Sequence, residues 1–325
     1  MNYDQAVKID QDNGSYKNGL VALCLIFGIS GSLISLFIII KIAKKPKPIH
    51  MDTILSLITI VIGFIASLSN LARGIMIKWP YNIFVYHREA CIFEFLTSAM
   101  FNSMAVYSIC FLSYERMLLI IFKITFSKKI WYTILSVFIL LHVTLFILIC
   151  AHKEFLFSQI AFGCTSNFNS QISVMSKYAA IIYSFCFISV AVNYITIITV
   201  QFKRSVKMQL RLNLDKNLVK RENLKILFRS SLIIVCFIVA YIGKDLSWYY
   251  QWSTGRVRPW TLDYVSSALQ LTHHVANCFI VLYMDPSIYR DTLDRAKLLF
   301  LRRTGQDPRS SIYYLQQPSL ISNNI

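Results

Sequence analysis

The chain has 325 residues, of which 56% are hydrophobic and 15% charged, and its formal net charge is +17. Soluble domains carry about 25% charged residues, so this composition excludes an ordinary soluble enzyme or binding domain. The positive charge does not indicate nucleic-acid binding, because the basic residues occupy short segments between long apolar stretches, as in membrane proteins that face anionic lipid.

The first 17 residues are polar and carry charges of both signs. They lack the basic start and apolar core of a cleaved signal peptide, so we expect residues 1–17 to form an extracellular N-terminus and the first apolar stretch to act as an uncleaved anchor. Asn13-Gly14-Ser15 is a glycosylation sequon that lies where an outside terminus would place it. We therefore predict glycosylation at Asn13.

Seven long apolar stretches follow this terminus. Each reaches or exceeds the roughly 20 residues that a helix needs to cross a ~30 Å hydrocarbon core. They cover residues 18–42, 53–77, 91–122, 130–151, 173–202, 226–250 and 262–284. The sequence therefore predicts an all-α membrane protein with a seven-transmembrane helix bundle, and the loops are too short for a second globular domain.

Lysine and arginine are distributed unequally between the two sides of this predicted bundle. The side with segments 41–52, 116–129, 203–225 and the C-terminal tail has 22 of the 33 Lys and Arg residues, and the other side has seven. Cytoplasmic loops are enriched in these residues. We therefore expect an extracellular N-terminus, a cytoplasmic C-terminus and a location in the plasma membrane.

Two of the eight cysteines are expected to face an oxidising exterior. Cys91 lies at the outer start of the third stretch, and Cys164 lies in the loop after the fourth. A disulfide between them would fix this loop over the outer ends of the helices. Two free thiols are the alternative, which is less common for exposed cysteines outside the cell.

The third stretch ends with Glu115-Arg116, and Arg116 follows Cys91 by 25 residues. At a rise of 1.5 Å per residue this interval spans about 37 Å, so Cys91 and Arg116 are expected at opposite faces of the membrane on one helix. Taken alone, an acid–arginine pair at this edge is better explained by interfacial charges that reach toward water.

The seventh stretch ends with Asp285-Pro286-Ser287-Ile288-Tyr289. A proline fits the first turn of a new helix and ends the preceding one. Asp285 is an acidic residue near the inner boundary of the membrane, so its side chain is expected to face the helix bundle rather than lipid. Residues 286–303 place apolar side chains on one helical side and basic residues around it, which predicts an amphipathic helix on the inner leaflet, followed by a cytoplasmic tail, 304–325.

The order of these features resembles a rhodopsin-like (class A) G-protein-coupled receptor over about residues 18–303. The interval between Cys91 and Arg116 equals the family's interval between its disulfide cysteine and its arginine. The further similar motifs are Glu115-Arg116-Met117, Cys236-Phe237, Asp285-Pro286-x-x-Tyr289 and the loop cysteine Cys164. Each motif has moderate specificity, and their ordered spacing across seven stretches carries the resemblance.

The resemblance implies a switch between two arrangements of the helices. Arg116 would pair with Glu115 in the inactive receptor, with Glu222 as a candidate second partner, and would meet a heterotrimeric G protein after activation. Tyr194 and Tyr289 would move inward to stabilise the open form. The other switch positions by this resemblance are Cys236, Phe237, Asp285 and Pro286. Arrestin-like proteins would be further partners.

The sequence departs from the family pattern at several positions. The first stretch has Gly31-Ser32 instead of Gly-Asn, and the second has no acid between Ile54 and Arg73, where the family's sodium-binding aspartate belongs. Stretches five and six lack their usual prolines. The sodium-linked network and the proline kink are therefore not implied, and the chain resembles a divergent member of the family.

The outer halves of stretches three, six and seven contain side chains that would suit a mostly apolar ligand cavity with a few polar groups. The candidates are Glu94, Ser98, Asn102, Tyr241, Lys244, Trp248, Gln270 and His274. Such a site would take an extracellular small molecule or peptide. Ser98 stands where aminergic receptors carry an aspartate, which disfavours a monoamine, and residues 262–284 contain no lysine for a retinal Schiff base. Alternatively, these side chains hydrogen-bond to one another between helices.

Other functions fit the sequence less well. The adjacent His273 and His274 point about 100° apart on a helix, unlike zinc ligands at i and i+4, and there is no Gly-rich phosphate loop or catalytic constellation. We therefore expect no enzymatic activity, metal or cofactor. A seven-helix ligand-gated channel of inverted orientation would need a cytoplasmic N-terminus, and a transporter would more often show repeat symmetry. Glycosylation at Asn13 distinguishes the two orientations.

Overall fold

A computed structural model describes residues 3–12, 14–45, 50–152, 155–166, 173–211 and 216–284 of the chain. Its elements in chain order are α1 (Tyr3–Asp12), α2 (Gly14–Ala43), α3 (Met51–Lys78), α4 (Ile83–Tyr86), α5 (Arg88–Glu94), η1 (Phe95–Ala99), α6 (Met100–Met117), η2 (Leu118–Phe122), α7 (Lys128–Ala151), β1 (Phe155–Phe157), β2 (Cys164–Ser166), α8 (Val174–Arg211), α9 (Lys216–Thr254) and α10 (Trp260–Met284). The π-helical turns η1 and η2 continue α5 and α6, so that Glu89–Phe122 is a single helical span.

Six of the described helical spans are long and apolar enough to cross a membrane. They are Gly14–Ala43, Met51–Lys78, Glu89–Phe122, Lys128–Ala151, Val174–Gln209 and Trp260–Leu282. Each of the six coincides with a stretch that the sequence predicted. Apolar stretches of this length form helices in lipid because a helix satisfies all its backbone polar groups internally, where lipid offers no hydrogen-bond partner. The predicted sixth stretch lies within α9, which is not among the six in the part of the chain that the structure describes. The architecture is that of a helical multi-pass membrane protein.

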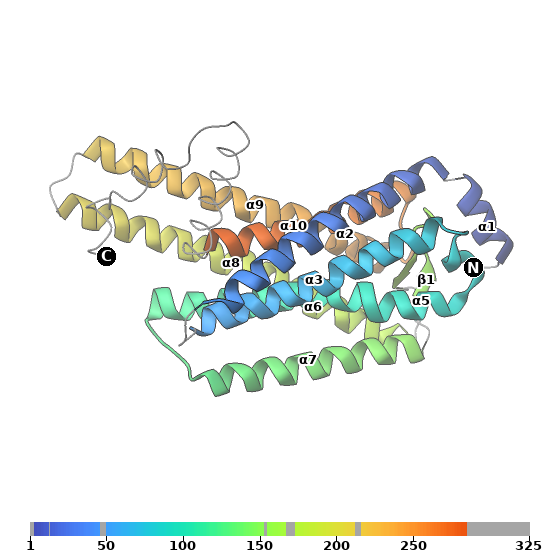
Figure 1. Cartoon of the computed structure of the whole chain (residues 1–325), viewed down its shortest axis with the longest axis horizontal. Helices are drawn as coiled ribbons and strands as arrows, with labels where there is room; N and C mark the ends of the chain where they lie inside the picture. Colours follow the sequence, from blue (N-terminus) through green and yellow to red (C-terminus); the bar gives the residue numbers. More distant parts are fainter. Residues whose placement is uncertain are drawn as a thin grey trace. The chain divides into compact units, whose positions relative to one another are not determined.

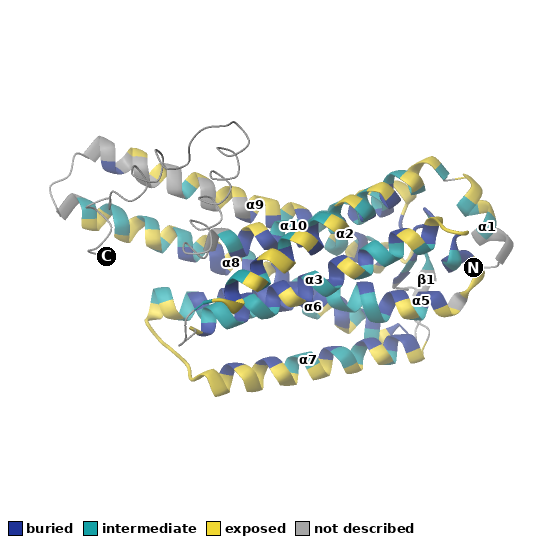
Figure 2. Ribbon diagram, viewed as in Figure 1, coloured by how far each residue is buried: buried dark blue, intermediate teal, exposed yellow. Residues whose placement is uncertain are grey.

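The outward faces of the helices carry large apolar side chains that remain exposed. Figure 2 shows such exposed positions along α2 and α7. Leu33 of α2, Leu140 and Leu141 of α7, Phe185 of α8 and Phe279 of α10 are each more than half exposed. Water would disfavour an apolar surface of this extent, whereas the hydrocarbon of a bilayer solvates it. The exposed faces therefore agree with the membrane-spanning architecture.

The helices pack so that α6 lies between α3 and α8 (Figure 1). α2 packs along α3, and α9 packs along α8. Hydrogen bonds attach α10 to its neighbours: Asn70 of α3 lies 2.8 Å from His274, and Asn277 donates to the Tyr241 hydroxyl of α9 at 2.7 Å. The span that begins near Cys91 therefore runs through the middle of the described helices.

The helices have two ends: the Cys91 end, where α5 begins, and the Arg116 end, where α6 finishes. The short helices α1 and α4 and the β1–β2 hairpin gather at the Cys91 end (Figure 1). Asn82 joins them, because its Nδ2 donates to Asp10 Oδ1 at 2.7 Å and to the Ala161 carbonyl at 2.8 Å. Neither α1 nor the hairpin was predicted from the sequence.

Close helix packing requires glycine at position 28. A Cβ atom there would lie 3.1 Å from the backbone nitrogen and 3.2 Å from the Cα of Leu71 on α3. Gly28→Ala should therefore lower the free energy of unfolding by about 1–3 kcal/mol, because backbone atoms cannot move aside. Gly63 is the matched control: a Cβ there meets nothing within 4 Å, so Gly63→Ala should stabilise the helix by roughly 0.5–1 kcal/mol. Thermal unfolding of the detergent-solubilised chain measures both, and equal effects would contradict the packing of α2 on α3.

Candidate functional site

The β1–β2 loop is covalently attached to the helices at the Cys91 end. Cys91 and Cys164 form a disulfide, with their Cα atoms 5.5 Å apart. Cys164 begins β2, and Phe157 of β1 is its antiparallel partner. The pairing agrees with the prediction made for these two cysteines. It places the loop 157–166 against α5 and η1.

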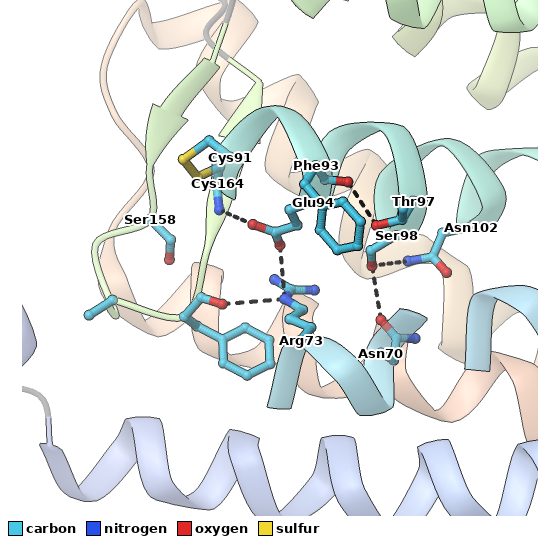
Figure 3. A network of polar contacts seen from close by, with 12 residues as sticks. Asn70, Arg73, Cys91, Phe93, Glu94, Thr97, Ser98, Asn102, Ser158 and Cys164 are labelled. Atoms are coloured by element: carbon cyan, nitrogen blue, oxygen red, sulfur yellow. Dashed lines mark hydrogen bonds and ion pairs between the residues drawn. A yellow bond between two sulfur atoms is a disulfide. The ribbon is translucent and has the colours of Figure 1, made fainter. Parts of the chain in front are cut away.

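Glu94 reinforces this attachment one helical turn after Cys91. Its Oε2 accepts a hydrogen bond from the backbone N–H of Cys164 at 2.7 Å, and its Oε1 lies 2.8 Å from Nε of Arg73 on α3 (Figure 3). Arg73 Nε also donates to the Phe162 carbonyl at 3.3 Å, and its guanidinium carbon lies 4.2 Å from the centroid of the Phe162 ring. The Glu94 side chain is 4% exposed, so this is a buried ion pair that spans two helices and the loop.

The backbone of the loop passes so close to Glu94 that only glycine fits at position 163. Gly163 has a φ of +143°, which side chains rarely adopt. A Cβ there would also lie 2.5 Å from both carboxylate oxygens of Glu94. The conformation of the loop and the position of the buried carboxylate are therefore mutually dependent.

A second buried ion pair joins the same loop to the start of α10. Arg258 Nη2 lies 2.6 Å from Asp263 Oδ1, and the Ser158 hydroxyl donates to Asp263 Oδ2 at 2.5 Å. Asp263 is 1% exposed and Arg258 is 4% exposed. Within the described ranges, Nε and Nη1 of Arg258 are buried without a hydrogen-bond partner.

The two ion pairs border a polar cavity of about 30 Å³, which is room for about two water molecules. It is lined by Arg73, Glu94, Ser98, Ala99, Asn102, Ser158, Cys164, Lys244, Arg258, Asp263, Ser267 and Gln270. Five of the eight predicted pocket residues are therefore brought together here: Glu94, Ser98, Asn102, Lys244 and Gln270. Sequence reasoning missed Arg73, Arg258 and Asp263. The sequence did contain a signal for these three residues, because charged residues at the ends of apolar stretches tend to face the protein interior rather than lipid.

The other three predicted pocket residues do not line this cavity. His274 lies 2.8 Å from Asn70, whose Oδ1 accepts from the Ser98 hydroxyl at 2.9 Å. The Tyr241 hydroxyl accepts a hydrogen bond from α10, and Trp248 packs its ring against Tyr183 at 5.0 Å between centroids. For these three residues the alternative interpretation, contacts between helices, describes the structure better.

Arg116 has a different partner from the one that the family resemblance implied. Its Nε and Nη2 each lie 2.7 Å from Oδ1 of Asp52, in the first turn of α3. The implied pairing with Glu115 is therefore wrong for this structure, in which Glu115 Oε2 is buried without a hydrogen-bond partner among the described residues. Neighbouring residues on a helix point about 100° apart, so Arg116 faces α3 while Glu115 does not share its direction.

Tyr194 of α8 lies close to Arg116 and is 4% exposed. Its hydroxyl is buried beside the guanidinium of Arg116. Phe237 is also buried and lies between Phe187 and Tyr241, at 5.7 and 4.7 Å between ring centroids. The arrangement thus places the predicted Tyr194 and Phe237 in the interior of the bundle.

The remaining predicted switch residues divide into two groups. Cys236 is exposed on the surface of α9, so it does not share the buried position of its neighbour Phe237. The other group cannot be compared with the structure. Asp285, Pro286 and Tyr289 lie outside the described residues, as do the glycosylation site Asn13 and the predicted amphipathic helix 286–303, and the side chain of Glu222 is not described.

No known protein family matches this sequence, and no curated protein sequence matches it. Among the described residues, no group of three or more His, Cys, Asp or Glu side chains is placed to hold a metal ion. The candidate functional features are thus a cavity with buried charges at the Cys91 end and an interhelical ion pair at the Arg116 end. One continuous helical span, Glu89–Phe122, joins them.

Proposed function

We propose that this chain is a seven-helix receptor that responds to an extracellular ligand at the Cys91 end and activates a heterotrimeric G protein at the Arg116 end. The resemblance of its motifs to rhodopsin-like receptors supports this proposal. In this proposal the chain lies in the plasma membrane with its N-terminus outside, and residues 286–303 lie on the inner leaflet.

The proposal adds α9, which contains the predicted sixth stretch, to the six membrane-spanning helices. Residues 226–243 contain a single charged residue, Arg229, in an otherwise predominantly apolar run, which is the composition of a transmembrane helix. α9 packs along α8, and Tyr241 near the middle of α9 accepts a hydrogen bond from Asn277 of α10. A helix that contacts two membrane-spanning neighbours is well placed to cross the membrane alongside them.

The Arg116–Asp52 pair is the observation that carries the proposal. Arg116 is 5% exposed, although it lies in the last turns of its helical span, and its partner belongs to a different helix. An ion pair between two helices holds them together only in the arrangement where both charges meet. Separation of α3 from α6 would free the guanidinium for a new acceptor, which is what a two-state switch requires.

A nucleotide-exchange assay tests the proposal directly. The full chain is reconstituted in lipid nanodiscs with each major class of G-protein heterotrimer, and uptake of a non-hydrolysable GTP analogue is measured across a ligand library. At least one heterotrimer should exchange nucleotide faster with the chain than without it. Arg116→Ala should abolish this acceleration, whereas Arg256→Ala, an exposed arginine in the loop after α9, should leave it unchanged. Normal signalling by Arg116→Ala, or no response from any heterotrimer, would reject the proposal.

A further inference from the structure

The cavity at the Cys91 end is lined by one basic side chain more than it has carboxylates. Three cationic side chains and two carboxylates line it. Glu94 is paired with Arg73 and Asp263 with Arg258, which leaves Lys244. Within the described residues Lys244 has no ion pair, and its Nζ lies 5.3 Å from the centroid of the Trp248 ring. An excess cation in a partly buried site is unfavourable unless an anion compensates it.

Donors for such an anion are already in place. Lys244 supplies an ammonium group with three donors, and Nε and Nη1 of Arg258 are buried without partners in the described chain. The remaining Nη2 of Arg258 is held by Asp263, which is itself fixed by the Ser158 hydroxyl. Arg258 is therefore orientated before any ligand arrives, and such preorganisation favours binding.

The size and charge of the cavity select among anions. A volume of about 30 Å³ fits roughly two water molecules, so it accommodates a planar carboxylate group more readily than a tetrahedral phosphate. The single surplus positive charge also matches a monoanion rather than a dianion. The hydroxyl and amide side chains of Ser98, Ser267 and Gln270 complete a polar wall.

We propose that this cavity binds the carboxylate of a small monocarboxylic acid, held by Lys244 and Arg258. This inference deepens the proposed receptor function and rests on it for the role of the acid as the activating signal. Charge-assisted hydrogen bonds from both cations to one carboxylate are the contacts that distinguish the acid from its neutral analogues.

Thermal unfolding of the purified full chain in nanodiscs tests the binding step without a G protein. The probes are acetate, propionate, butyrate and benzoate, each compared with the primary amide of the same carbon skeleton. A ligand that binds only the folded chain raises its melting temperature. At least one acid should do so while its amide does not. Lys244→Gln should weaken this acid's binding about tenfold or more, and Lys244→Arg should retain it.

Lys177→Gln serves as the matched control, because Lys177 in the first turn of α8 does not line the cavity. It should bind the acid like the unmodified chain. Stabilisation by no acid of the panel, equal stabilisation by the amides, or unchanged binding in Lys244→Gln would each overturn the inference. The same acid is then added to the nucleotide-exchange assay. Binding that depends on Lys244 without any G-protein response would reject the receptor function but leave the carboxylate site standing.

Discussion

Asp52→Asn should raise the basal G-protein activity of the chain by roughly fivefold to thirtyfold. The substitution keeps the shape of the side chain but removes the negative charge that pairs with Nε and Nη2 of Arg116. The paired arrangement then loses about 1–2 kcal/mol, a reduced value because the Asp52 side chain is 35% exposed. A free-energy difference of this size changes a two-state population by the factor stated.

The measurement is nucleotide exchange without ligand, normalised to the amount of folded chain in the nanodiscs. Glu115→Gln is the control, since the ion pair described for Arg116 is with Asp52, and it should change basal activity much less than Asp52→Asn. The double variant Asp52→Asn/Arg116→Ala should be as inactive as Arg116→Ala alone. If Glu115→Gln activated more strongly than Asp52→Asn, the pairing seen here would not be the one that restrains the switch.

Arg73→Leu should lower the free energy of unfolding by about 3 kcal/mol or more. The carboxylate of Glu94 would remain buried, 4% exposed, and would keep the hydrogen bond from the Cys164 N–H but lose its ion-pair partner. Removal of one partner from a buried ion pair typically costs about 3–5 kcal/mol, because the other charge is left uncompensated. The β1–β2 loop should also lose the hydrogen bond from Arg73 to Phe162.

A second substitution identifies the cause of this loss. Glu94→Gln keeps an acceptor for the Cys164 N–H but removes the buried charge, so Arg73→Leu/Glu94→Gln should recover about 1 kcal/mol or more relative to Arg73→Leu alone. Thermal unfolding in detergent gives the values for both single variants and the double. Simple addition of the two single effects would show that Arg73 stabilises the fold through packing on Phe162 rather than through the ion pair.

The membrane-spanning helices follow from local properties of the sequence. A run of about 20 apolar residues has no stable conformation in lipid other than a helix, whatever its neighbours do. Six of the seven predicted stretches therefore coincide with helices that can cross a membrane, while the prediction missed α1 and the β1–β2 hairpin. The hairpin exists because Cys164 is bound to Cys91 and to Glu94, 73 and 70 residues earlier in the chain. No local pattern in residues 155–166 reports those contacts.

The disulfide and the positions of Cys91 and Arg116 on one helix were accessible to reasoning from the sequence, because a regular rise per residue converts spacing into depth. The partner of Arg116 was not accessible. Asp52 is 64 residues away on another helix, and the adjacent Glu115 was the obvious choice from the sequence. Only the rotation of α6 against α3 decides which carboxylate meets the guanidinium.

The cavity shows the same division between local and long-range information. The composition of the stretches already identified Glu94 and Lys244 as polar groups near the ends of apolar helices. The charges that match or fail to match them belong to Arg73 on α3 and to Arg258 and Asp263 around the start of α10. Hydropathy is a property of each segment by itself, so the sequence was sufficient to identify six helices that are long and apolar enough to cross a membrane. Charge neutralisation in the interior depends on distances between segments, so tertiary structure determined which carboxylates are matched and that Lys244 has no carboxylate partner among the residues that the structure describes.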